Sequence, residues 1–211
     1  MSGHRHHHHR HHHQADDVPA GPGYRRALWF ALAVNAGLFV TEAVGGHAAE
    51  SVSLWADALD FLGDSVTYAL ALAAAAMAQP TRSRLAWAKG LSMAAIGLWV
   101  IGLAAWRAAT HADPEPATMG LIAVLALAGN VAAALALYPH AEGDSMMRSV
   151  WLCTRNDALG NLAVLAAAAG VFGTGTRWPD LAVAALMAGL ALHSGIAVMR
   201  AARAELQNAS T

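Results

Sequence analysis

Charged residues are scarce in this sequence: Asp, Glu, Lys and Arg account for 13% of 211 residues, whereas 56% are hydrophobic. Because an ordinary soluble domain carries about 25% charged residues, the shortage indicates a protein embedded in a membrane. The net charge of -1, without a basic stripe, argues against nucleic-acid binding. The single cysteine, Cys153, excludes an internal disulfide, and the hydrophilic N-terminus does not resemble a cleavable signal peptide.

What the sequence does contain is six apolar segments, each close to the ~20 residues that cross a hydrocarbon core. They cover residues 26–45, 52–78, 85–108, 119–138, 150–172 and 181–199. Short connections with Gly and Pro separate them, so consecutive helices are expected to be antiparallel neighbours. We therefore predict an all-α polytopic membrane protein with six transmembrane helices. Its expected parts are a His-rich disordered cytoplasmic tail (1–23), the six-helix transmembrane domain (24–203) and a short C-terminal tail (204–211).

The Lys and Arg residues predict the orientation, because they favour the cytoplasmic side of a membrane. Most of them fall on the side that would hold both termini: Arg5, Arg10, Arg25, Arg26, Arg82, Arg84, Lys89, Arg148, Arg200 and Arg203. The other side holds little beyond Arg107 and Arg177, together with Glu50, Asp113 and Glu115. We expect both termini to be cytoplasmic, in a bacterial inner (plasma) membrane.

Carboxylates interrupt two of the apolar segments. Asp57, Asp60 and Asp64 lie in segment 52–78, and Asp157 follows Cys153 by four residues in segment 150–172. A carboxylate at bilayer depth costs about 3 kcal/mol on insertion scales, so such residues usually line an ion pathway. Asp60 and Asp64 are one helical turn apart and share a face, and Cys153 and Asp157 repeat this spacing. Two such helices can close a four-ligand site around a divalent cation.

These motifs resemble the cation diffusion facilitator family of divalent metal/proton antiporters. The run SVSLWADALDFLGD, residues 51–64, is similar to that family's second helix, in which a Ser-rich start leads to an Asp and then to a (His/Asp)-x-x-x-Asp pair. The run RSVWLCTRNDALGN, residues 148–161, is similar to its fifth helix, which carries His-x-x-x-Asp. The resemblance covers about residues 24–203 and includes further positions: Asn35, Gly45, Gly46 and Asp180.

The resemblance implies that Asp60, Asp64 and Asp157 are metal ligands. Cys153 stands where the family usually has His, and a thiolate would favour zinc, cadmium or another thiophilic metal. Alternatively, Cys153 is a packing residue, and the site has three protein ligands plus water or Asn156. Asp57 is a further candidate, as an accessory ligand, a proton carrier or a structural hydrogen-bonding group.

The function that the resemblance implies is efflux of a divalent metal of the zinc, cadmium or cobalt class by proton antiport. We expect no enzymatic activity and no cofactor; the metal is the cargo, with zinc as first choice. The expected partners are metal ions, protons, the bilayer and, by analogy, a second copy bound through transmembrane helices. We expect a short form without the family's cytoplasmic C-terminal domain. The alternatives are a proton-coupled exporter of a small organic cation and a membrane-anchored metal buffer or sensor.

Three other features lie outside these motifs. Glu42 is interpreted as an interfacial carboxylate. Arg155 either pairs with a buried carboxylate or extends toward water. The N-terminal tract is either an affinity tag or a native metal-chelating tail, which its Arg interruptions favour; its histidines are His4, His6, His7, His8, His9, His11, His12 and His13.

Overall fold

The computed structural model of the chain describes residues 21–73, 79–110, 113–140 and 145–208. These residues contain no strand, and their helices are α1 (Pro22–Ala48), α2 (Val52–Ala73), α3 (Gln79–Thr110), α4 (Pro116–Leu137), the short 3-10 helix η2 (Tyr138–His140), α5 (Ser145–Thr174) and α6 (Trp178–Asn208). Each predicted apolar segment coincides with one long helix, although the end of the second, 74–78, lies outside the described residues. The all-α prediction is therefore confirmed.

Five of the six long helices are long and apolar enough to cross a membrane: α1, α3, α4, α5 and α6. The remaining helix, α2, is also long enough, but it carries Asp57, Asp60 and Asp64 within three turns. These carboxylates give α2 more charge than an ordinary span has. Because α2 contacts α1, α3, α5 and α6, it lies among the spanning helices and forms the sixth span.

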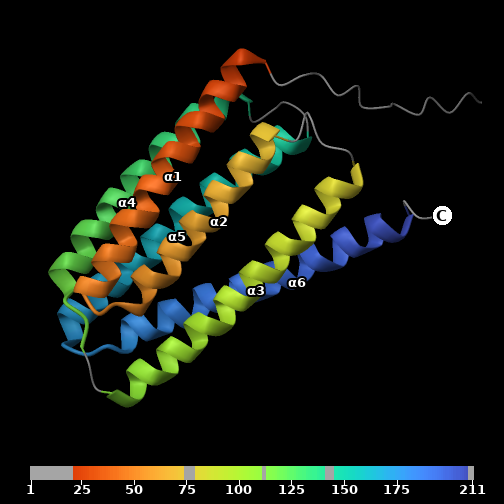
Figure 1. Cartoon of the computed structure of the whole chain (residues 1–211). Helices are drawn as coiled ribbons and strands as arrows, with labels where there is room; N and C mark the ends of the chain where they lie inside the picture. Colours follow the sequence, from red (N-terminus) through yellow and green to blue (C-terminus); the bar gives the residue numbers. More distant parts are fainter. Residues whose placement is uncertain (1–20, 74–78, 111–112, 141–144, 209–211) are drawn as a thin grey trace, which may run out of the picture.

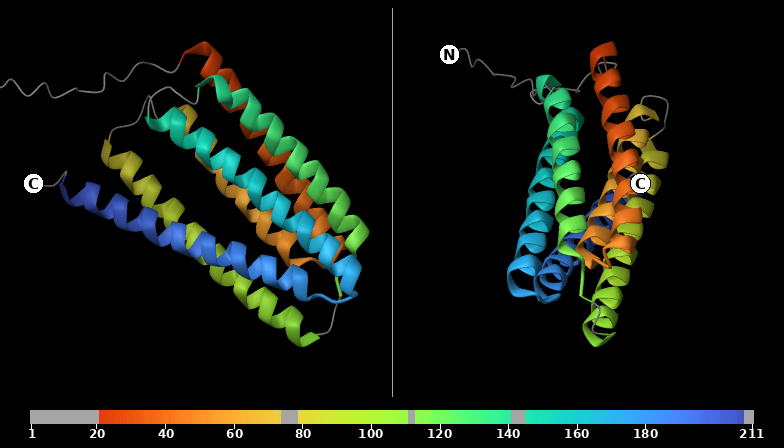
Figure 2. Two further views of the ribbon diagram at one scale, coloured as in Figure 1. Left: turned by 180° about the vertical axis from the view of Figure 1, so that it is seen from behind. Right: turned by 90° about the vertical axis from the view of Figure 1, so that its left-hand side faces the viewer.

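The helices form two groups (Figure 1). Helices α1, α2, α4 and α5 make an antiparallel bundle, while α3 and α6 lie side by side as a pair along one flank of it (Figure 2). We call the end at which α1 begins and α6 ends the terminal end. The α1–α2, α3–α4 and α5–α6 connections lie at the opposite end.

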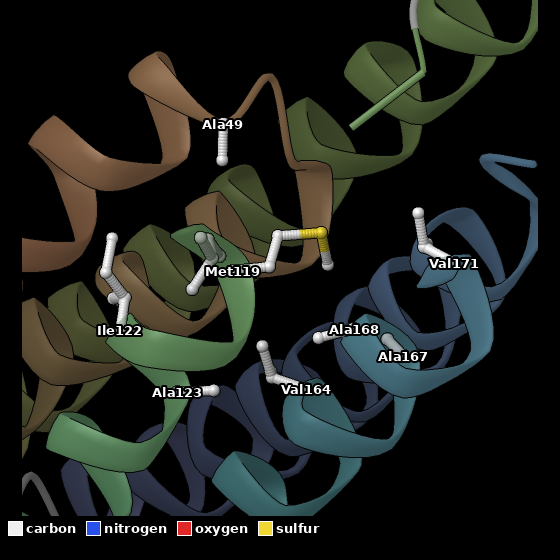
Figure 3. Packing of buried hydrophobic residues seen from close by; sticks show 9 residues of the cluster. Ala49, Met119, Ile122, Ala123, Val164, Ala167, Ala168 and Val171 are labelled. Atoms are coloured by element: carbon white, nitrogen blue, oxygen red, sulfur yellow. The ribbon is translucent and has the colours of Figure 1, made fainter. Parts of the chain in front are cut away.

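Two apolar clusters close the two ends of the four-helix bundle. The first, at the opposite end, joins α1, α2, α4 and α5 through small and branched side chains (Figure 3): Ala49, Leu54, Met119, Ile122, Ala123, Val164, Ala167, Ala168 and Val171. The second lies at the terminal end: Tyr24, Ala27, Leu28, Ala31, Tyr68, Ala133, Leu137 and Val150. Along α2 and α5, the carboxylates Asp57, Asp60, Asp64 and Asp157 lie between the residues that belong to the two clusters.

The α3–α6 pair is held by direct backbone contact. A Cβ atom added at Gly90 would lie 2.7 Å from the Gly195 carbonyl oxygen, and one at Gly195 would lie 2.6 Å from the Gly90 carbonyl oxygen. Only glycine allows such an approach, which is a common way for membrane helices to pack. This contact determines the rotation of α3 and therefore which of its residues face α2.

Candidate metal site

The predicted carboxylates of α2 and α5 meet inside the protein. Asp60 and Asp64 lie one turn apart on α2, half-buried, and Asp157 is half-buried on α5. The carboxyl groups of Asp64 and Asp157 are within hydrogen-bonding reach of each other. Asp60 is close enough to both to interact electrostatically. The structure thus places three of the residues that the sequence predicted as ligands near one another, but not close enough together to hold a metal ion as they stand.

The Asp64–Asp157 pair is unfavourable unless a cation or a proton offsets the negative charges of the two carboxylates. Two carboxylates are both acceptors, so they can share a hydrogen bond only when one of them carries a proton. One oxygen of Asp64 and one of Asp157 are buried and have no hydrogen-bond donor among the residues that the structure describes. Buried like charges repel strongly at low dielectric constant. The pair is therefore suited to hold either protons or a metal cation.

A hydrogen bond between α2 and α5 positions the pair. The Tyr68 hydroxyl lies 2.6 Å from the Thr154 hydroxyl, and Thr154 donates to the Val150 carbonyl at 3.0 Å. Tyr68 therefore acts as the donor to Thr154. Tyr68 is one turn past Asp64, and Thr154 is about one turn before Asp157. This contact therefore fixes the positions of the two carboxylates along α2 and α5 relative to each other.

Cys153 lies at the outer side of this group. Its side chain is exposed, yet it is close enough to Asp60 and Asp64 to interact with them electrostatically. Among the described residues, no three Cys, His, Asp or Glu side chains are already gathered closely enough to hold a metal ion. Metal binding by this set would therefore require the side chains to close in from the positions seen here.

Asp57 faces a different partner. Its side chain is 2% exposed and lies close enough to the Glu42 carboxyl group on α1 to interact with it electrostatically. Glu42 itself is fully buried, and neither of its oxygens has a hydrogen-bond donor among the described residues. The interpretation of Glu42 as an interfacial carboxylate is therefore wrong. Its position near the end of an apolar helix suggested the interface, but its place on the helix turns it toward α2.

Arg155 points away from the carboxylates. It is exposed, its guanidinium lies 5.4 Å from the centre of the Trp151 ring, and it donates to the Asn156 amide oxygen at 3.3 Å. A guanidinium over an aromatic face is a favourable cation–π arrangement. Of the two alternatives for Arg155, the structure supports the one in which it does not pair with a buried carboxylate.

Two polar residues of the apolar helices were missed as functional candidates. Asn130 on α4 is fully buried, and within the described part of the chain both of its amide atoms are without a hydrogen-bond partner. An Asn inside the apolar run 119–138 was the signal that could have revealed it. Lys89 on α3, which counted only toward membrane orientation, lies close to Asp60 and Asp64. The histidines of the N-terminal tract lie outside the described residues.

The fold and this group of residues define a polytopic helical membrane protein with carboxylates collected between two of its spans. Comparison of sequences makes the class more specific. The family profile for the cation efflux transmembrane domain matches residues 28–207. The chain belongs to the cation diffusion facilitator family.

Curated relatives carry related names. The chain is 29% identical over 177 residues to the metal cation efflux system protein CzcD of Cupriavidus metallidurans, covering 78% of this chain and 56% of that protein. It is 28% identical over 197 residues to a cadmium, cobalt and zinc/H(+)-K(+) antiporter of Bacillus velezensis, covering 86% and 62%. It is 31% identical over 182 residues to the zinc transporter ZitB of Escherichia coli, covering 80% and 58%. The chain thus spans about three fifths of the length of these relatives.

Proposed function

We propose that this protein exports a divalent metal cation by proton antiport, and that Asp60, Asp64, Asp157 and Cys153 form its transport site. The observation that carries the proposal is the meeting of the Asp64 and Asp157 carboxyl groups, from two helices, within a membrane domain. The names of the relatives, which include zinc, cadmium and cobalt, support the same class of cargo.

The chemistry of these side chains supplies the coupling. Carboxylates and thiolates bind either a proton or a metal ion at one lone pair, so metal binding releases protons. Metal from the cytoplasm would displace protons from the site. After the helices rearrange, protons from the other side would displace the metal. No covalent step is required, so we propose a transporter without enzymatic activity.

The remaining assignments follow from the same proposal. The terminal end faces the cytoplasm of a bacterial cell, as its Arg residues favour. Zinc is the preferred cargo, because Cys153 would add a soft ligand to hard carboxylates. Asp57, paired with Glu42, acts as an accessory group beside the site. The His-rich tail collects metal at the cytoplasmic entrance, and two copies associate through their membrane helices.

Transport into proteoliposomes with an imposed pH gradient tests the main proposal. Zinc, cadmium and cobalt accumulation is compared for the wild type, Asp64→Ala and Asp113→Asn. Asp113 is an exposed acid in the α3–α4 connection, so its variant controls for the loss of one carboxylate elsewhere. We expect gradient-dependent accumulation in the wild type and Asp113→Asn, and none in Asp64→Ala.

Other outcomes would favour the alternatives. Undiminished transport by Asp64→Ala would remove the site assignment. Movement of a small organic cation without metal would indicate the organic-cation exporter. Metal binding without any transport, lost on deletion of residues 1–20, would indicate a membrane-anchored buffer or sensor.

A further inference from the structure

Lys89 is the one lysine in the sequence, and it lies within an apolar span. Its side chain is half-buried on α3. An ammonium group inside a membrane domain is costly unless it has polar partners or reaches water. Its partners therefore indicate what it does.

The described hydrogen-bond partner of the Lys89 side chain lies on α2. Its Nζ donates a hydrogen bond to the Thr67 hydroxyl oxygen, and the Thr67 hydroxyl in turn donates to the Gly63 carbonyl oxygen at 2.9 Å. Thr67 follows Asp64 by three residues and Asp60 by seven, so all three lie on one face of α2. The ammonium group is therefore held beside the carboxylates, toward the terminal end.

Lys89 also lies near three residues of the candidate site. Lys89 is close enough to Asp60, Asp64 and Cys153 to interact electrostatically with each of them. A lysine that only extended toward water would not need an acceptor on α2. The neighbouring Gly90 packs against Gly195, which fixes the rotation of α3 and keeps Lys89 directed toward α2.

We propose that Lys89 is a tethered counter-cation that balances part of the carboxylate charge when no metal is bound and that weakens metal binding. This inference rests on the proposed transport site. Three ionised carboxylates, the Cys153 thiolate and one ammonium group carry a net charge of about -3, which a divalent metal reduces to about -1. Without Lys89 the same ligands would keep a charge of about -2 after binding, and would release the metal more slowly.

Zinc titration of the purified full chain in lipid nanodiscs, with the eight tail histidines replaced by Gln in every sample so that only the helix site binds zinc, tests the role of Lys89. We expect Lys89→Met and Lys89→Gln to lower the Kd for zinc by about tenfold or more, because one repelling charge is removed. The amide of Gln can keep the hydrogen bond to Thr67, so it separates charge from tethering. Lys89→Arg keeps the charge and should retain the wild-type Kd. Arg155→Gln, which removes an exposed charge from α5, is the matched control and should also leave the Kd unchanged.

Transport kinetics provide a readout that a merely structural role would not produce. Lys89→Met should lower both the KM for zinc and the maximal rate, since tighter binding slows release. Unchanged or weaker zinc binding by both neutral variants, with binding still abolished in Asp64→Ala, would overturn the counter-cation role and leave the transport site intact. Zinc binding that persists in Asp64→Ala would instead overturn the proposed site.

Discussion

Asp180, in the first turn of α6, caps the start of α2 by accepting hydrogen bonds from the backbone N–H groups of Val52 and Ser53, at 2.8 and 3.0 Å. It also accepts from the hydroxyl groups of Ser51 and Ser53, at 2.7 and 2.6 Å. All four residues are buried. Because the first N–H groups of a helix have no partner within it, this side chain from another helix fixes where α2 begins and thus the depth of its carboxylates.

Removing this cap should destabilise the protein. We expect Asp180→Ala to lower the free energy of unfolding by about 2–4 kcal/mol, because buried N–H and hydroxyl groups lose their acceptor. Asp180→Asn keeps one acceptor oxygen, so its free energy of unfolding should lie between those of the wild type and Asp180→Ala. Unfolding in mixed micelles measures the change. Asp113→Ala is the control, because the Asp113 side chain is exposed and its ion-pair contact with Arg177 is long, 3.6 Å. Equal effects of the Asp180 and Asp113 variants would contradict the capping role.

The close contact of α3 and α6 predicts opposite effects at two glycines of α6. Gly195→Ala should destabilise the protein by about 1–3 kcal/mol, because its Cβ would meet the α3 backbone. Gly189 has open space at its Cβ position, so Gly189→Ala should be neutral or stabilise by up to about 1 kcal/mol. Thermal unfolding in detergent distinguishes the two. If Gly195→Ala instead stabilised the protein, α3 and α6 would not be held together by their close contact at Gly195.

The start of α4 should respond to pH. Glu115 accepts hydrogen bonds from the N–H groups of Ala117 and Thr118, and bonding from Thr118 and then Ala117 lowers its pKa below the ordinary 4.5. A lowered pKa gives stability that is present above the unfolded-state pKa and is lost as the pH falls through the folded-state pKa. The unfolding temperature of the wild type should therefore fall more between about pH 5 and pH 3 than that of Glu115→Gln. Parallel pH curves would contradict this.

Cys153 offers a chemical test of the proposed ligand set. Its exposed thiol should react with a maleimide, and zinc should slow that reaction if the sulfur binds the metal. Magnesium should give no protection, because it prefers oxygen ligands. Protection should disappear in Asp64→Ala. Equal labelling with and without zinc would leave three carboxylates with water or Asn156 as the ligand set.

Much of this protein could be predicted from the order of its residues. Apolar length specifies the helices, because a bilayer demands about 20 such residues per span. Spacing specifies that Asp60 and Asp64 share a face of α2, because i and i+4 are neighbours on any α-helix. The family likewise follows from local motifs.

Contacts between helices could not be predicted in this way. The sequence led to the wrong position for Glu42, at the membrane interface, and left Arg155 open; only packing turned Glu42 inward toward Asp57 and Arg155 outward onto Trp151. Lys89 counted only as a positive charge near a membrane surface until the Gly90–Gly195 contact set the rotation of α3. The sequence by itself determined the spans and the local spacing of the carboxylates. The tertiary structure alone decided which charges meet, because the rotation and depth of each helix depend on contacts with distant segments of the chain.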